Sequence, residues 1–247
     1  MVSNAASALG EAIGTLFETA IIQGLRADVE QRGYTIRPAK LKNGTGNVYQ
    51  IDAVIFDSKE RPTVIIDPKY IRYTKHNRDK GSWLCVAHYN LRKTFPTIRK
   101  SIAVLAGRWS TPSLALIHSF GVETIHLPFQ ALVDALKPFA IDFDWAEKDR
   151  ATAITAWGTF STLGLTQRAL IATAITASIM GQLRSDVVTT LDTDLSTLPR
   201  RVSTVEILLK TDQNEMLLSA FDSVADALRA LADLVSDKPD ISAFMGT

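Results

Sequence analysis

The stretch Gln50–Lys69, QIDAVIFDSKERPTVIIDPK, constrains the fold of this chain more than any other. Two runs of apolar, largely β-branched residues flank a short polar segment, which predicts a β-hairpin with a loop longer than the tightest types. If Phe56 faces Thr63 across that loop, antiparallel pairing places Asp52 opposite Asp67. Directly opposed Cβ atoms lie roughly 4.5–5.5 Å apart and like charges there repel, so the two aspartates require compensation.

A hard divalent cation between the two carboxylates would supply that compensation. Mg²⁺ suits a site that offers one or two carboxylates together with a substrate phosphate. Lys69 follows Asp67 by two residues, so the period of a strand directs both side chains to one face. The sequence therefore predicts that two acids and an amine converge. A buried Asp67–Lys69 ion pair without catalysis is the structural alternative, but it leaves the charge of Asp52 without a partner.

These residues carry a family resemblance. Asp52 followed by the tripeptide Asp67–Lys69, DPK, has the form D…(D/E)-x-K and resembles the PD-(D/E)xK nuclease superfamily, whose fold is restriction-endonuclease-like. Upstream, an apolar helical stretch contains Gly14 and Glu18 as G-x-x-x-E and looks like the first helix of that fold, in which a glutamate often joins the site. The resemblance covers about residues 10–136. D-x-K alone is a weak pattern, but an opposed acid and the upstream helix make it more specific.

The resemblance implies metal-assisted hydrolysis of DNA phosphodiester bonds. Asp52 and Asp67 would hold Mg²⁺, with the backbone carbonyl of Pro68 as a further ligand, and the ion would activate the phosphate and a water. Lys69 would orient or deprotonate the attacking water and stabilise the charge that develops on the phosphate. The expected partner is therefore double-stranded DNA.

The acid on the first helix is less well determined. Glu18 shares a helix face with Glu11 and with apolar residues, and a helix that is apolar on two sides is usually buried on both. A buried glutamate requires a partner, which the metal site would provide directly or through a water. The family pattern favours Glu18, while Glu11 remains the competing acid.

Positive charge is concentrated beside the two aspartates. Residues 59–108 carry twelve lysines and arginines but three acids, for a net charge of +9, whereas the whole chain carries +1. A basic region next to metal-binding acids suits a phosphate backbone, although a solvated helix face would have the same composition. The candidate DNA-binding residues are Arg72, Lys75, Arg78 and Lys80.

No other motif in the sequence points to chemistry. The single cysteine, Cys85, excludes an internal disulfide and a cysteine-based zinc cluster, and the four histidines lack metal-ligand spacing on one helix face. The longest uncharged apolar-leaning run, residues 169–181, is too short to span a bilayer, and the N-terminus lacks the features of a signal peptide. We therefore expect a cytoplasmic protein with no membrane segment.

The predicted elements of residues 1–138 follow the order α-β-β-β-α-β-β, which is expected of a restriction-endonuclease-like core. This order contains a meander and a helical crossover, so the α/β core should hold a central mixed sheet flanked by helices. Trp83, Tyr89 and Phe95 are expected in its core. Beyond the hairpin, the predicted helices span residues 7–32, 76–95 and 129–136, and the predicted strands span 34–41, 101–106, 113–118 and 123–127.

Residues 139–247 form a second, mainly helical region in this prediction, and the family resemblance does not cover it. Its role is dimerisation, DNA reading or completion of the core. A helix-turn-helix around residues 163–166 is one candidate for a DNA reader. The region begins with an acidic, linker-like stretch at 139–150, followed by helical spacing at 151–184, a strand at 204–210 and an amphipathic helix at 216–234.

Three functions are compatible with the sequence. The favoured one is a type II restriction endonuclease, expected as a homodimer because two-fold symmetry places two active sites on opposite strands. The second is a repair or recombination nuclease of the same fold, such as a junction resolvase or an Mrr-like enzyme. The third is a DNA-binding protein that keeps the fold but no longer cleaves, against which the intact Asp52, Asp67 and Lys69 argue.

Overall fold

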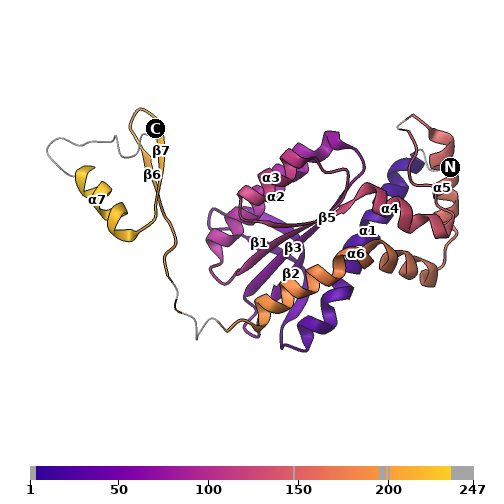
Figure 1. Cartoon of the computed structure of the whole chain (residues 1–247), viewed down its shortest axis with the longest axis horizontal. Coiled ribbons are helices and arrows are strands. Elements are labelled where there is room, and N and C mark those ends of the chain that lie inside the picture. Colours follow the sequence, from indigo (N-terminus) through magenta and orange to yellow (C-terminus); the bar gives the residue numbers. More distant parts are fainter. Residues whose placement is uncertain (1–3, 147, 195–198, 200, 235–247) are drawn as a thin grey trace. The chain divides into compact units, whose positions relative to one another are not determined.

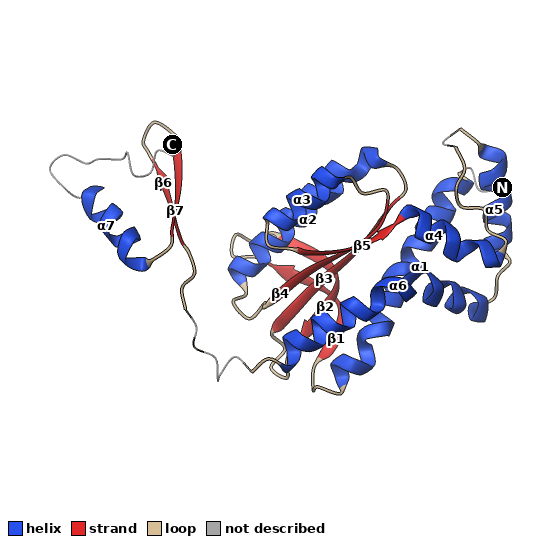
Figure 2. Cartoon of the chain, viewed as in Figure 1, coloured by secondary structure: helices blue, strands red, loops and turns tan. Residues whose placement is uncertain are grey.

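The chain forms two compact units, residues 1–193 and 194–247. The computed structural model describes residues 4–146, 148–194, 199 and 201–234. In the first unit a five-stranded mixed sheet of order β1-β2-β3-β4-β5 lies between two layers of helices (Figures 1 and 2), which confirms the predicted α/β class. The strands are β1 (Thr35–Lys42), β2 (Val48–Phe56), β3 (Pro62–Ile71), β4 (Lys100–Gly107) and β5 (Glu123–Pro128).

Helices cover both faces of this sheet because alternate strand residues are apolar on both sides. Ile65 of β3 packs in a cluster with the helix that follows β3, whereas Ile66 packs in a cluster with the N-terminal helix. Helices α2 and α3 cover the first face, and α1, α4 and α6 cover the second, with α5 against α1. The helices are α1 (Ala5–Glu30), α2 (Asn77–Thr94), α3 (Thr111–Ser119), α4 (Phe129–Leu136), α5 (Arg150–Ser161) and α6 (Leu165–Asp192), with short 3₁₀ turns η1 (Thr74–His76) and η2 (Lys137–Phe139).

Helix α1 is the central helix of the larger layer. Asn4 caps it by accepting a hydrogen bond from the backbone N–H of Ser7 at 3.2 Å. Leu9, Ile13 and Phe17 are fully buried along its inner side. By length and mean hydropathy (1.3) α1 is the one helix in the described part of the chain that alone could cross a membrane, yet here its apolar side packs in the core of the first unit.

Strands β2 and β3 form the predicted hairpin with one irregularity. A bulge pairs Phe56 with Pro62, not with Thr63 as predicted. Beyond the bulge the ladder returns to the predicted register and ends at the pair Ala53–Ile66. The next residue on each strand is an aspartate, so the predicted opposition of the two acids survives the bulge.

Residues 113–118 are helical, so the prediction of a buried strand there is wrong. Ser110 caps α3 by accepting a hydrogen bond from the N–H of Ser113 at 3.4 Å, and Pro112 stands in the first turn. Both residues favour the start of a helix. The helix buries Ser113 and Ile117, which lie four residues apart, whereas Leu116 is exposed.

Two aromatic residues of α2 are exposed, although the prediction placed Trp83, Tyr89 and Phe95 in the core. Trp83 is 62% exposed and Tyr89 is 42% exposed, because the buried side of α2 is formed by other residues. Phe95, just after the helix, is partly buried against the core as predicted.

The structure divides the chain after residue 193, not after 138 as predicted. Phe143 and Trp145, within the stretch predicted to be a linker, are buried, while Asp142 and Asp144 are exposed. An extended segment alternates its side chains between two sides, so acidic residues face water on a segment that packs into the core. Helices α5 and α6 pack along α1 and belong to the same unit.

The turn between α5 and α6 coincides with the predicted helix-turn-helix. The two helices are bent by 118° there. Along its length, however, α6 buries Ile171, Ile175 and Ile179 in the core of the first unit. Whether its exposed first turn reads DNA stays a prediction.

The second unit differs from the prediction in one segment. The strand expected at 204–210 is present, but the segment 216–234 forms a strand and then a helix. Ser223 separates the two because its hydroxyl accepts a hydrogen bond from the N–H of Asp226 at 3.1 Å and so starts the helix. Residues 147, 195–198, 200 and 235–247 of the predicted region 139–247 lie outside the described residues. The elements are β6 (Val205–Lys210), β7 (Met216–Phe221) and α7 (Val224–Leu234).

Candidate active site

The candidate site lies where β2 and β3 separate. Beyond Ala53–Ile66, β2 continues beside β1 and β3 continues beside β4. Asp52 and Asp67 are the first residues past the last pair, and the N–H of Asp52 bonds to the carboxylate of Asp67 at 3.3 Å. Pro68, buried in β3, has no N–H with which to continue the ladder, which is one reason that the strands part here.

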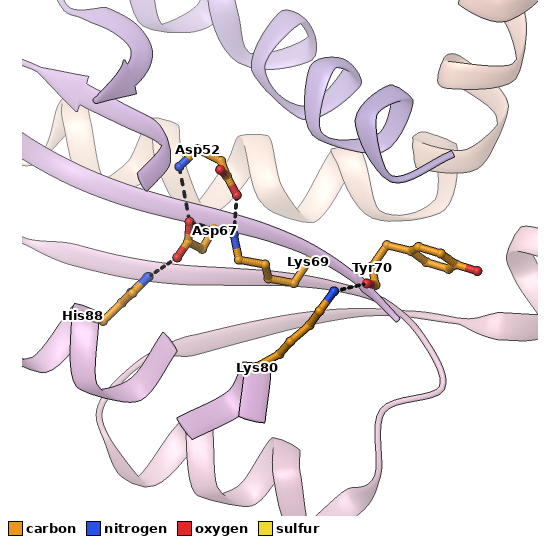
Figure 3. Close-up of polar contacts among 6 residues, drawn as sticks. All are labelled: Asp52, Asp67, Lys69, Tyr70, Lys80 and His88. Carbon is orange, nitrogen blue, oxygen red and sulfur yellow. Dashed lines mark hydrogen bonds and ion pairs between the residues drawn. The ribbon is translucent and has the colours of Figure 1, made fainter. Parts of the chain in front are cut away.

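The amine of Lys69 contacts both aspartates, as Figure 3 shows. Its Nζ forms an ion pair with Asp52 Oδ2 and lies 3.4 Å from Asp67 Oδ1. Asp67 is only 3% exposed. The predicted convergence of two acids and an amine is therefore present, and the ammonium compensates the repulsion between the carboxylates.

His88 of α2 contacts the same cluster and is not among the predicted site residues. It is fully buried, and its Nε2 lies 3.3 Å from Asp67 Oδ2 (Figure 3). Within the part of the chain that the structure describes, its Nδ1 has no hydrogen-bond partner. The signal in the sequence is helical spacing: Leu84 and Leu91 place His88 on the apolar side of α2, where a polar group requires a partner.

Glu18 of α1 is half-buried beside these charges. Burial raises the pKa of its carboxyl group, the charges of Asp52 and Asp67 raise it further, and the charge of Lys69 lowers it. Glu11, the competing acid, is exposed two turns earlier on α1. Both glutamates line a groove between α1 and the end of β3. Glu18 and Lys69 line the same groove, so Glu18 lies on the side of the aspartates where the ammonium of Lys69 stands.

The charges in the cluster shift the pKa values of its members in different directions. Burial alone would raise the pKa of Asp67, but the hydrogen bond with His88 and the charge of Lys69 outweigh it and lower that pKa. For Asp52, burial outweighs the attraction of Lys69 and raises the pKa. Burial favours a neutral Lys69, yet the carboxylates outweigh it and raise its pKa. Lys69 is therefore a cation at neutral pH.

A groove of about 750 Å³ runs between α1 and the end of β3, with Glu18 and Lys69 in its lining. Gly10 and Gly14 of α1 face Tyr70 across it, and a Cβ atom at either glycine would lie 3.9 Å from the Tyr70 ring. Any larger side chain would extend from there into contact with that ring. The glycine of the G-x-x-x-E pattern therefore keeps this part of the groove open.

Arg72, a predicted DNA-binding residue, is buried and is not available on the surface. Its guanidinium donates hydrogen bonds to the carbonyl oxygens of Phe143 at 2.8 Å and Trp145 at 3.2 Å. It also lies 3.7 Å from the centroid of the Trp145 ring. Arg72 therefore ties the extended segment after α4 to the end of β3, because the aromatic and carbonyl groups of that segment satisfy the cation.

The other three predicted DNA-binding residues are exposed. Lys80 as a whole is exposed, but its amine donates a hydrogen bond to the carbonyl oxygen of Tyr70 at 3.1 Å inside the groove (Figure 3). Burial of that amine and repulsion by Lys69 lower its pKa. Lys75 lines the groove 5.3 Å from the Tyr73 ring, and Arg78 is exposed in the first turn of α2.

The fork, meaning the point past Ala53–Ile66 where β2 and β3 separate, offers donors that suit a hard divalent cation. Asp52, Asp67 and Glu18 offer carboxylate oxygens, which Mg²⁺ prefers. Among the described residues no ready-made group of three acidic, histidine or cysteine donors is found. The place between the carboxylates of the two aspartates is taken by the ammonium of Lys69. A cation would therefore have to displace that ammonium.

No protein-family model matches this chain, and no curated protein matches it. A solved structure that matches is that of AF1548, a protein of unknown function, with 12% sequence identity and a TM-score of 0.33 over 68% of this chain and 99% of that chain. A likeness at this level carries no conclusion about function.

Proposed function

We propose that this protein is a Mg²⁺-dependent endonuclease that hydrolyses phosphodiester bonds of double-stranded DNA, namely a sequence-specific type II restriction endonuclease acting in the cytoplasm as a homodimer. One observation carries the proposal. Lys69 stands between the carboxylates of Asp52 and Asp67 at the point where two strands part, with Glu18 beside them. This arrangement resembles the D…D-x-K constellation of the PD-(D/E)xK nucleases.

The order of elements supports a restriction-endonuclease-like fold. The first unit runs α1-β1-β2-β3-α2-β4 around a mixed sheet, with the acids on β2 and β3. The predicted order ended in two consecutive strands, whereas the structure places the helix α3 between β4 and β5. Where the two strands part, the side chains of Asp52 and Lys69 are partly exposed, whereas that of Asp67 is buried.

The chemistry follows from the charges of the residues. Bound by Asp52, Asp67 and the carbonyl of Pro68, with Glu18 binding directly or through a water, Mg²⁺ would supply Lewis-acid activation of the scissile phosphate. The neighbouring carboxylates raise the pKa of Lys69 in the absence of the ion. Beside bound Mg²⁺, Lys69 would orient or deprotonate the attacking water and stabilise the negative charge that develops on the phosphate.

Neighbouring groups hold these residues in position. His88 holds one oxygen of Asp67 on the side of α2, which leaves Oδ1 toward the fork. Lys80 places a second cation in the groove that Glu18 and Lys69 line. A DNA strand would therefore meet positive charge next to the acids.

The proposal is tested by incubating the full chain with plasmid and phage DNA in Mg²⁺ and in EDTA. The matched variants are Asp67→Asn, which keeps the shape of the buried side chain, and Asp134→Asn, which alters an exposed aspartate on α4. We expect discrete fragments from the wild type and from Asp134→Asn in Mg²⁺, and none from Asp67→Asn or in EDTA.

Other outcomes redirect the assignment. Cutting confined to branched or modified DNA would indicate a repair or recombination nuclease. DNA binding without cutting of any of these substrates would indicate a protein that keeps the fold but has lost cleavage, and it would contradict the proposal.

A further inference from the structure

The second unit leaves one face of its hairpin uncovered by the residues that the structure describes. Alternate residues of β6 and β7 face opposite sides. On one side α7 packs against the strands and buries Ala227 and Ala230. On the other side Leu208, Met216 and Leu218 are 49%, 66% and 63% exposed. These three residues are the outer patch.

The outer patch is continuous. Leu208 pairs directly with Leu218 across the ladder, and Met216 lies two residues before Leu218 on the same face. A two-stranded hairpin is marginally stable in water unless further strands or a helix cover it. Here one side is covered by a short helix and the other exposes large apolar side chains, which marks a surface for association.

The charge of the unit favours a protein over nucleic acid as the occupant. Residues 194–247 contain nine acidic and five basic residues, for a net charge of −4. A phosphate backbone would be repelled by this charge, since nucleic-acid affinity depends on lysine and arginine. The occupant of the outer patch is therefore an apolar protein surface. A second copy of this unit carries the same net charge, so it fits only if each acid at the interface meets a base of its partner.

We propose that the occupant is the same hairpin of a second copy of this chain. Glu206 and Lys210 lie on the same face as Leu208, two residues before and after it, and both are exposed. When two hairpins pack face to face about a two-fold axis through Leu208, Glu206 meets Lys210 of the partner subunit, and the reverse pair forms by symmetry. The outer patch is thus self-complementary in apolar surface and in charge.

This inference does not depend on the proposed nuclease activity, and its test measures association. The mass of the full chain is followed by sedimentation over a range of concentrations. We expect a dimer for the wild type. Glu206→Lys alone, or Lys210→Glu alone, sets like charges against each other and raises the dissociation constant by about fivefold or more. The double variant restores the opposite charges and should return close to the wild-type value.

Two further variants complete the test. Asp212→Lys makes the same charge change in the hairpin turn, away from the outer patch, and should leave the dimer intact. Leu218→Glu should abolish it while the far-ultraviolet circular dichroism is retained. A wild type that stays monomeric would overturn the proposal, as would a dimer that Leu218→Glu does not weaken. A double charge variant as weak as either single one would overturn the two-fold pairing.

Discussion

At the scale of single residues, Lys69 both stabilises the folded site and stands where a metal ion would bind. Its ammonium neutralises part of the charge of Asp52 and Asp67, of which the second is almost fully buried. Leaving a buried carboxylate without its cation is strongly unfavourable. Metal binding would compensate the same charge, so the ammonium and the ion compete for one place.

Replacing Lys69 by methionine separates these two roles. Lys69→Met keeps an apolar stem but removes the charge, so we expect the free energy of unfolding in EDTA to fall by about 2–3 kcal/mol, less than for a fully buried pair because Lys69 is partly exposed. Saturating Mg²⁺ should then raise the melting temperature of this variant more than that of the wild type. Equal shifts in both proteins would argue against a shared place for ammonium and ion.

His88 is expected to act by orienting Asp67. His88→Phe fills the buried space but leaves Asp67 Oδ2 without its partner, and loss of such a group behind a metal ligand typically reduces metal affinity or activity about 10–100-fold. We expect slower cleavage and a higher Mg²⁺ concentration at half-maximal rate. His88→Gln retains an N–H donor and should recover most of both. A Gln variant as impaired as the Phe variant would assign His88 to packing alone.

At the scale of elements, the hairpin that carries both aspartates is fixed by its turn. Asp57 Oδ1 accepts hydrogen bonds from the N–H groups of Lys59 and Arg61, each at 2.9 Å, and Oδ2 accepts from the Arg61 side chain at 2.8 Å. Aspartate is suited to this position because its short side chain can bond to the backbone two residues on. The turn therefore sets the register that brings Asp52 and Asp67 together.

Asp57→Ala should lower the free energy of unfolding by about 1 kcal/mol at neutral pH. Burial alone would raise the pKa of Asp57, but the hydrogen bonds from Arg61 and Lys59 outweigh it and lower that pKa. The stabilisation that ionised Asp57 gives the folded state is therefore complete above its ordinary pKa of 3.8. It is lost as the pH falls through the lower pKa of the folded state. Urea unfolding at neutral pH and at about pH 3 should show the difference from wild type shrinking with acid.

The end of β4 depends on a glycine. Gly107 has a φ of +104°, and a Cβ atom there would lie 1.9 Å from the carbonyl oxygen of Ile71, at the end of β3 beside the groove. Gly107→Ala should therefore destabilise the protein by at least about 2 kcal/mol. Gly158, inside α5, has no atom near its would-be Cβ, so Gly158→Ala should be neutral or stabilising. Thermal unfolding of both variants checks the contrast.

The sequence predicted some elements and not others for identifiable reasons. The hairpin was predictable because the β-branched runs and polar turn are local. The apolar run at 113–118 has no clear period, so the cap at Ser110 decides that it is helical. Residues 216–234 contain apolar positions that fit a strand followed by a helix as well as one helix.

In the candidate site too, what depends on neighbouring residues was predictable and what depends on distant residues was not. Asp52, Asp67 and Lys69 were predictable because a single hairpin brings them together. The burial of Arg72 was not, because its partners Phe143 and Trp145 lie more than 70 residues away in the sequence. A basic stretch does not reveal which of its side chains turns inward.

At the scale of the whole molecule, the first unit contains the sheet, both helix layers and every candidate site residue. Its largest core cluster runs from α1 through α6 and ends within residues 1–193. We therefore expect a chain of residues 1–193 to unfold cooperatively, within a few degrees of the main transition of the full chain. Calorimetry of both proteins measures this. A truncated chain without a thermal transition would show that residues 194–247 complete the fold.

The most direct test of the nuclease assignment is the single-turnover rate of DNA cleavage by the wild type and by Asp52→Asn at saturating Mg²⁺. The substituted amide has the shape of the carboxylate, and the ammonium of Lys69 keeps Asp67 as an acidic partner at 3.4 Å. We expect the variant to fold and to cleave at least about a hundredfold more slowly. Equal rates for the two proteins, or cleavage by the wild type that persists in EDTA, would contradict catalysis by a metal ion held between Asp52 and Asp67.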